Sequence, residues 1–215
     1  MNPGHRPRAA LLAGATGSGK TPLGIYLASN GLWGSRCFHF DFGAELRRIN
    51  AGKAEHDLSR SELEVIRKSL ATGSVLEQHD YGIAGNLIRR FVSANNSYQD
   101  DWILLNGFPR NAGQAACVSE FLDLRALIML TAGSEVARTR IRLDSGGDRA
   151  GRSDDTTELV ERKLEDFREQ YNSLIHFFEA RSAAVYYIPV SINTGPEEIG
   201  EKLEKQAAGQ TAGEG

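Results

Sequence analysis

The segment GATGSGKT, residues 14–21, constrains the fold of this chain more than any other part of its sequence. It matches the pattern G-x-x-x-x-G-K-[ST] in full, follows the apolar run AALLA and precedes a predicted helix over 20–29. Glycines in such a loop let successive backbone N–H groups face one anion, and the helix N-terminus adds positive potential. The pattern predicts a site for the phosphates of ATP, rather than a glycine-rich turn without a ligand. Its predicted members are Gly14, Ala15, Thr16, Gly17, Ser18, Gly19, Lys20 and Thr21.

The loop also predicts two separate chemical roles. Lys20 is expected to reach the β- and γ-phosphates of the nucleotide, and the Thr21 hydroxyl is expected to ligate Mg²⁺. The cofactor expected from the sequence is therefore Mg²⁺ bound together with ATP as substrate.

Short apolar runs alternate with amphipathic segments along the whole chain. The apolar runs predict about five strands, and the segments between them predict helices. Strands that alternate with helices indicate βαβ units, so we expect an α/β fold with a parallel five-stranded sheet, helices on both faces and a P-loop NTPase-type architecture. The predicted strands cover 8–13, 36–40, 102–105, 126–130 and 185–188, and the predicted helices cover 20–29, 44–70, 87–92, 112–121, 134–143, 156–181 and 196–207. Flexible tails are expected at 1–7 and 206–215, with a single domain over 8–205.

A second motif, NGFPR, occupies residues 106–110 at the end of the predicted strand 102–105. Open α/β sheets bind ligands at the carboxyl ends of their strands, so this motif and the phosphate loop should face one crevice. Arg110 is expected to grip a phosphate there, because a guanidinium can bind phosphate through two parallel hydrogen bonds. Without the phosphate loop, the same residues would equally indicate a turn with a surface arginine.

Two further segments carry arginines near predicted loop or helix starts. GRSDD, residues 151–155, places Arg152 in a glycine-rich loop that would suit a closing lid, although its aspartates would also suit a solvated helix N-terminus. FHFDFGAELRRI, residues 38–49, places Arg47 and Arg48 in the first turns of a helix. A solvated helical face accounts well for Arg48.

Composition argues against several classes of protein. The net charge is −3, with 25 basic and 28 acidic residues, so there is no electrostatic case for a nucleic-acid partner. The five histidines form no HxxxH or HxH pair, and the two cysteines are far apart, as expected of free thiols in a reducing compartment. No apolar run approaches the roughly 20 residues that span a membrane, and the polar start lacks a signal-peptide core. We therefore expect a cytoplasmic protein without membrane contact.

The four motifs, in this order and spacing, resemble those of adenylate kinases and related nucleoside monophosphate kinases over roughly residues 8–205. The resemblance is closest to the short-lid form, because the loop between Arg142 and Arg152 is short. It implies a small helical acceptor-binding insertion at about 42–72 and a lid at about 142–153. It further implies transfer of the γ-phosphoryl group of ATP to a nucleoside monophosphate, by a monomer.

The resemblance also assigns roles to individual residues. Lys20, Arg140, Arg152 and Lys163 would act on the transferring phosphoryl group, while Arg47 and Arg110 would bind the acceptor phosphate. Gln114 would read the acceptor base. The full acceptor set is Gly43, Arg47, Val75, Gly107, Arg110 and Gln114. The lid set is Arg142, Arg149, Asp154 and Asp155, and the metal set is Thr21 with Asn106 acting through water.

Several positions depart from the family pattern. Phe42 and Ala44 stand where a threonine and an acid are usual, so the acceptor base stays open. An arginine is expected near Asp144, and another where Lys163 stands. Asn106 replaces the acid that usually accepts hydrogen bonds from Mg²⁺-bound water. The loss of that charge predicts a reaction slower by about one to three orders of magnitude, unless Asp41 or Glu45 places the metal instead.

Three functions remain open on the sequence alone. The first is a kinase that acts on AMP, or on UMP or CMP as the next acceptors. The second is a nucleotide-binding module of the same fold with little catalysis, which the departures at Ala44, Asn106, Asp144 and Lys163 favour. The third is a P-loop kinase of a non-nucleotide small molecule, against which Arg47 and Arg110 argue because they suit an acceptor that already carries a phosphate.

Overall fold

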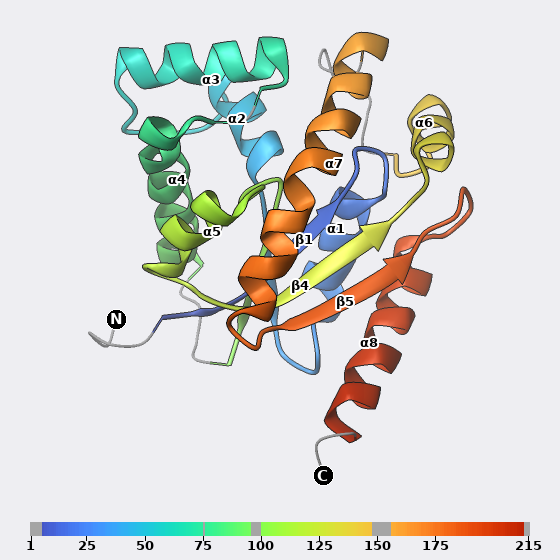
Figure 1. The fold of residues 1–215 in the computed structure, drawn as a ribbon. Coiled ribbons are helices and arrows are strands. Elements are labelled where there is room, and N and C mark those ends of the chain that lie inside the picture. Colours follow the sequence, from blue (N-terminus) through green and yellow to red (C-terminus); the bar gives the residue numbers. More distant parts are fainter. Residues whose placement is uncertain (1–5, 75, 96–99, 148–155, 213–215) are drawn as a thin grey trace.

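The computed structural model describes residues 6–74, 76–95, 100–147 and 156–212, and its centre is a five-stranded sheet (Figure 1). All paired strands run parallel, in the order β2-β3-β1-β4-β5. The strands are β1 (Arg8–Gly14), β2 (Cys37–Asp41), β3 (Trp102–Asn106), β4 (Asp123–Thr131) and β5 (Ala184–Pro189). The α/β fold predicted from the alternating pattern is confirmed.

Helices cover both faces of the sheet. Buried side chains of α4, α5 and α7 pack on one face, and those of α1 and α8 pack on the other. Figure 1 shows α7 running across its face of the sheet. The helices are α1 (Lys20–Asn30), α2 (Phe42–Asn50), α3 (Arg60–Thr72), α4 (Tyr81–Ala94), α5 (Ala112–Ser119), α6 (Ser134–Arg142), α7 (Thr157–Glu179) and α8 (Pro196–Ala212), with a short 3₁₀ turn η1 (Gln78–Asp80).

The central strand β1 explains why its sequence is apolar throughout. Ala9, Leu11 and Ala13 point into the core under α4 and α7, while Ala10 and Leu12 point into the core under α1 and α8. Successive side chains of a strand face opposite sides, so a strand covered on both faces needs a continuous apolar run. This double burial fixes β1 and places the loop that follows it at the carboxyl edge of the sheet.

The predicted helix over 44–70 is two helices. It is interrupted at residues 51–59, after which Ser59 starts α3 with a capping box: its hydroxyl accepts from the Glu62 N–H, and the Glu62 carboxylate accepts from the Ser59 N–H. α2 starts at Phe42 because the Asp41 carboxylate accepts a 2.8 Å hydrogen bond from the Ala44 N–H. α2 and α3 occupy most of the segment predicted as the acceptor-binding insertion.

The C-terminal helix also differs from its prediction. α8 continues to Ala212, five residues beyond the predicted end, and so includes most of the segment expected as a flexible tail over 206–215. The part of that segment in α8, residues 206–212, contains three alanines and one glycine, and alanine is the strongest helix former. No helix in the described part of the chain is both long and apolar enough to cross a membrane.

Candidate active site

One cavity opens where β1, β2 and β3 end, as expected for an open parallel sheet. The phosphate loop follows β1, α2 follows β2, and the NGFPR segment follows β3. The opposite wall is formed by α7, and the end of α3 contributes further side chains. The residues that line the cavity include Gly14, Thr16, Gly17, Gly19, Lys20, Thr21, Asp41, Phe42, Gly43, Arg47, Ser69, Gly73, Ser74, Asn106, Gly107, Arg110, Arg140, Lys163, Asp166 and Gln170.

The loop after β1, which was predicted to bind phosphate, has positive φ at Gly14, Gly17 and Gly19. Gly14 adopts a φ of +149°, and a Cβ built there would lie 2.7 Å from Ser18 Oγ and 2.8 Å from the Leu130 carbonyl oxygen, so only glycine fits. Ala15 and Ser18 are buried. They are absent from the lining, whereas the other six predicted members line the cavity. Lys20 begins α1, and its Nζ donates to the carbonyl oxygens of Gly14 and Ala15 at 2.7 and 2.9 Å.

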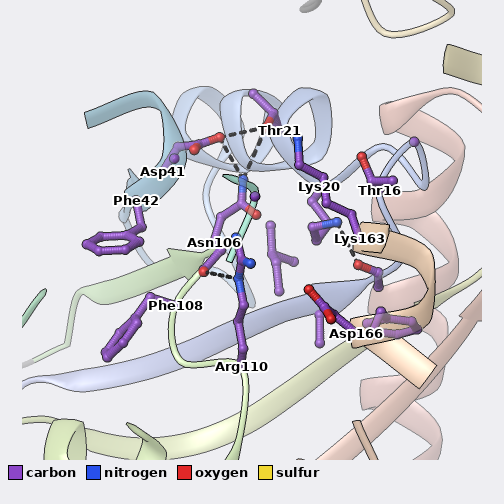
Figure 2. Close-up of a pocket in the computed structure, with 18 of the residues that line it drawn as sticks. Thr16, Lys20, Thr21, Asp41, Phe42, Asn106, Phe108, Arg110, Lys163 and Asp166 are labelled. Carbon is purple, nitrogen blue, oxygen red and sulfur yellow. Dashed lines mark hydrogen bonds between the residues drawn. The ribbon is translucent and has the colours of Figure 1, made fainter. Parts of the chain in front are cut away.

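Beside Lys20, three polar side chains form a closed hydrogen-bond network (Figure 2). The Thr21 hydroxyl donates to Asp41 Oδ2 at 2.6 Å. The Asn106 amide donates to the same carboxylate oxygen at 2.8 Å and to Thr21 Oγ1 at 3.2 Å. Asp41 and Asn106 are the last residues of β2 and β3, and they are register partners in the sheet. The network therefore joins the phosphate loop to the ends of two neighbouring strands.

These side chains fit a magnesium ion bound together with nucleotide phosphates. A hydroxyl, a carboxylate and an amide carbonyl are hard oxygen donors of the kind that Mg²⁺ prefers. In the described residues no group of three or more His, Cys, Asp or Glu side chains could hold a metal by itself. A cation here would therefore share its ligands with phosphate oxygens, which is the usual arrangement for Mg²⁺. The structure brings together the predicted Thr21 and Asn106, and it adds Asp41 to them.

Two arginines that were predicted to bind the acceptor line the cavity. Arg47 comes from α2 and lies over Gly43, where a built Cβ would be 3.4 Å from its guanidinium. Arg110 follows β3, and its Nε donates to the Gly107 carbonyl at 2.9 Å. The rings of Phe42 and Phe108 pack 5.2 Å apart, and Figure 2 shows both rings on the Asp41 side of the cavity. Four of the predicted acceptor residues therefore line the cavity: Gly43, Arg47, Gly107 and Arg110.

Gln114 is held away from the cavity lining. Its side chain is fully buried, its Oε1 accepts from the Arg110 N–H at 2.7 Å, and its Nε2 donates to the Leu76 carbonyl at 3.2 Å. In this structure the amide braces Arg110 and the segment after α3, and Gln114 is not among the residues that line the cavity. A contact with an acceptor base remains a prediction.

The remaining predicted residues that the structure describes lie on α6 and α7. Lys163 lines the cavity from α7, together with Asp166 and Gln170, which were not predicted from the sequence. Arg140 reaches the cavity but is 5% exposed, with donors turned to backbone carbonyls. Arg142 is exposed at the end of α6 and is not part of the lining. Val75, Arg149, Arg152, Asp154 and Asp155 lie outside the described residues.

Sequence comparisons relate this chain to known nucleotide kinases. No family model matches the chain. The adenylate kinase of Thermus thermophilus is 30% identical over 154 residues, which cover 61% of this chain and 79% of that protein. The adenylate kinase of a Synechococcus strain is 26% identical over 182 residues, covering 77% and 92%. The uridylate kinase of Saccharomyces cerevisiae is 25% identical over 142 residues, covering 66% and 65%.

Proposed function

This chain belongs to the nucleoside monophosphate kinase family, and we propose that it transfers the γ-phosphoryl group of ATP to a nucleoside monophosphate, with AMP as the first acceptor. One observation carries the proposal. A complete phosphate loop and two arginines from separate segments line the same cavity at the carboxyl edge of the sheet. A protein that only bound ATP would not need the second set of phosphate-binding side chains.

The loop after β1 holds the phosphates of ATP. Its backbone N–H groups and the N-terminus of α1 bind phosphate oxygens, and Lys20 exchanges its present carbonyl partners for the β- and γ-phosphates. Thr21, Asp41 and Asn106 would hold Mg²⁺ bound together with ATP, and this ion would neutralise charge on the phosphate oxygens. Lys163, across the cavity on α7, adds a positive charge near the transferring group.

Arg47 and Arg110 bind the phosphate of the acceptor. Charge-assisted hydrogen bonds from two guanidinium groups hold a dianion much more strongly than neutral donors do. In the reaction, an acceptor phosphate oxygen attacks the γ-phosphorus of ATP, and the bond from that phosphorus to the β–γ bridging oxygen breaks. ADP leaves with the bridging oxygen, and the acceptor becomes a diphosphate. The protein contributes mainly positioning and electrostatic stabilisation.

UMP or CMP is the second candidate acceptor. The buried Gln114 amide already has a donor partner and an acceptor partner inside the protein, which weakens the expectation that it reads adenine. Phe42 also stands where the family usually has a threonine, and it lies beside Gly43 in the lining of the cavity. These two observations favour testing pyrimidine acceptors alongside AMP.

The direct test incubates the purified protein with ATP, Mg²⁺ and one of AMP, GMP, CMP, UMP or dTMP, and measures diphosphates by chromatography. Diphosphate from at least one acceptor, absent with Lys20→Ala, is the expected result. Melting curves of both proteins check that the variant is folded. If none of the acceptors yields diphosphate while ATP still binds, the chain is instead a nucleotide-binding module with this fold.

A further inference from the structure

We propose that Asp41 provides the carboxylate of the magnesium site. It acts there by accepting the hydrogen of the Thr21 hydroxyl, which leaves the hydroxyl oxygen free to face the cation. The inference rests on the proposed function, since it concerns the cation that accompanies ATP. By resemblance, the charge is expected at position 106, at the end of β3, where this chain has an amide. The structure assigns it to the end of the neighbouring strand β2.

Register is the first argument. Asp41 and Asn106 are paired residues at the ends of two parallel strands, so their side chains occupy equivalent places at the edge of the sheet. The Asn106 amide nitrogen lies 2.8 Å from Asp41 Oδ2, and the Asn106 side chain is almost fully buried. A carboxylate at position 41 and a carboxylate at position 106 would therefore lie close to the same cation position in the cavity. Moving the charge from one strand to the other keeps it beside the phosphate loop.

The second argument is the orientation of the Thr21 hydroxyl. Its hydrogen is donated to Asp41 at 2.6 Å, and its oxygen accepts from Asn106 at 3.2 Å. A hydroxyl oxygen has one hydrogen to donate and two lone pairs. With the hydrogen and one lone pair committed, the remaining lone pair is available to a cation. Without an acceptor such as Asp41, the hydroxyl hydrogen could turn toward the cation and repel it.

The Asp41 carboxylate is itself held in place. Its Oδ1 accepts the 2.8 Å hydrogen bond that caps α2, while its Oδ2 serves Thr21 and Asn106. Both oxygens are therefore fixed by groups from three different elements. This rigidity is what a group that orients a metal ligand requires, because outer partners set the direction of the ligand's lone pairs.

Other acids near the site are less suited to this role. Glu45, the alternative named from the sequence, pairs with Arg48 at 2.9 Å and is absent from the cavity lining. Asp166 lines the cavity from α7, on the wall opposite the Thr21 network, as Figure 2 shows. Among the acids that line the cavity in the described residues, Asp41 is the one with a hydrogen bond to Thr21.

The pairing also explains why position 106 is an amide in this chain. Two carboxylates at the 2.8 Å separation seen between Asp41 and Asn106 would repel each other, because like charges would then face one another without a donor between them. An amide donates to the carboxylate instead. Adding an acid at 106 to the present protein should therefore bring no gain, although the same acid should help once Asp41 is neutral.

Six proteins test the proposal: the natural chain, Asp41→Asn, Asn106→Asp, the exchanged double variant, Thr21→Val, and Thr21→Val combined with Asp41→Asn. The readout is the affinity for ATP with and without Mg²⁺, measured by calorimetry with no acceptor present. Asparagine caps helices as well as aspartate does, so Asp41→Asn keeps the start of α2. Melting curves confirm that each variant is folded.

We expect Asp41→Asn to lose about tenfold or more of the Mg²⁺-dependent gain in ATP affinity, with metal-free ATP binding unchanged. Asn106→Asp alone should show no gain, and the exchanged double variant should recover most of the loss. In a Thr21→Val background, Asp41→Asn should have little further effect, because Asp41 acts through that hydroxyl. A folded Asp41→Asn that keeps its Mg²⁺ dependence, or an exchanged variant without recovery, overturns the proposal.

The calorimetry results can be told apart from the results of the diphosphate assay that tests the proposed function. The calorimetry uses only ATP and Mg²⁺, so failure to phosphorylate any acceptor leaves the role of Asp41 intact. Conversely, a kinase whose Mg²⁺ dependence ignores Asp41 keeps its function and loses only this inference.

Discussion

The Nε of Arg140 donates a 3.1 Å hydrogen bond to the carbonyl oxygen of Gly17, inside the phosphate loop. The Nη1 of the same guanidinium lies within 3.0 Å of the carbonyl oxygens of Ser191, Ile192 and Thr194, between β5 and α8. Arg140 thus ties the phosphate loop, 123 residues before it in sequence, to a segment that lies 51 to 54 residues after it. Its planar, forked donors suit this task, and a lysine ammonium cannot reproduce them.

Arg140→Lys should therefore lower the free energy of unfolding by about 2–4 kcal/mol, because buried carbonyl groups lose charged donors. Urea denaturation measures this change. The sequence predicted that Arg140 acts on the transferring phosphoryl group, and that role predicts a different result. Unchanged stability together with a much lower kcat would support direct contact with the phosphoryl group over a bracing role.

For Gln114, too, the structure indicates a bracing role, whereas the sequence predicts recognition of the acceptor base. Gln114→Leu should lower the free energy of unfolding by about 1–3 kcal/mol, because the Arg110 N–H and the Leu76 carbonyl lose their buried partners. It should weaken the binding of every acceptor monophosphate to the same extent, because Gln114 acts by holding Arg110 in place. KM values for the panel of monophosphates, with denaturation curves, measure both effects. A tenfold change in base preference at unchanged stability would mean that the amide turns to the base when a nucleotide binds.

Gly24 of α1 is predicted to tolerate no side chain. A Cβ built at this position would lie 2.2 Å from Nε2 of His39 on β2, so either the buried His39 ring must move or α1 must shift away from β2. Gly24→Ala should cost about 1–3 kcal/mol of stability by overpacking. Gly82→Ala is the matched control, because that exposed helical position has nothing within 4 Å of a built Cβ. The control should be neutral or gain about 0.5 kcal/mol, and equal effects in thermal melts would contradict this packing.

His39 should make stability depend on pH below neutrality. Burial lowers the pKa of His39 from its ordinary 6.5, and the nearby Asp41 charge offsets only part of that shift. The unfolded chain therefore takes up a proton near pH 6.5 that the folded chain refuses. Stability is retained above this pH and falls as the pH drops below it, by up to about 1.4 kcal/mol per unit.

The measurement compares the natural chain with His39→Gln by urea denaturation between pH 8 and pH 5. The difference in free energy of unfolding between the two proteins should be constant above pH 7 and should shift in favour of the variant below pH 6.5. Parallel curves over the whole range would show that His39 takes up its proton equally in both states.

Sequence patterns predicted local features of this molecule well. The apolar run before GATGSGKT specified β1, since only a strand buried on both faces needs such a run, and the loop glycines specified the turn after it. The break between α2 and α3 was missed, because Ser59 and Glu62 act as a capping box inside a segment whose apolar spacing suggests one helix. The extra turns of α8 were missed because the Gly/Ala-rich tail suggested disorder.

The parts that could not be predicted depend on contacts between distant segments. Asp41 and Asn106 are 65 residues apart, and only the register of β2 on β3 brings their side chains together. The burial of Gln114 likewise depends on Leu76, 38 residues away. A residue type at a motif position identifies a chemical possibility, but the partners that orient its donors come from the tertiary structure.

The most direct test of the central claim follows the γ-phosphoryl group itself. ATP labelled at the γ-phosphate is incubated with Mg²⁺, the protein and the preferred monophosphate from the panel, and the products are separated. Label in the β-phosphate of the new diphosphate, dependent on both the monophosphate and Lys20, is the predicted result. Label released only as inorganic phosphate, or left in ATP with every monophosphate, would contradict a nucleoside monophosphate kinase.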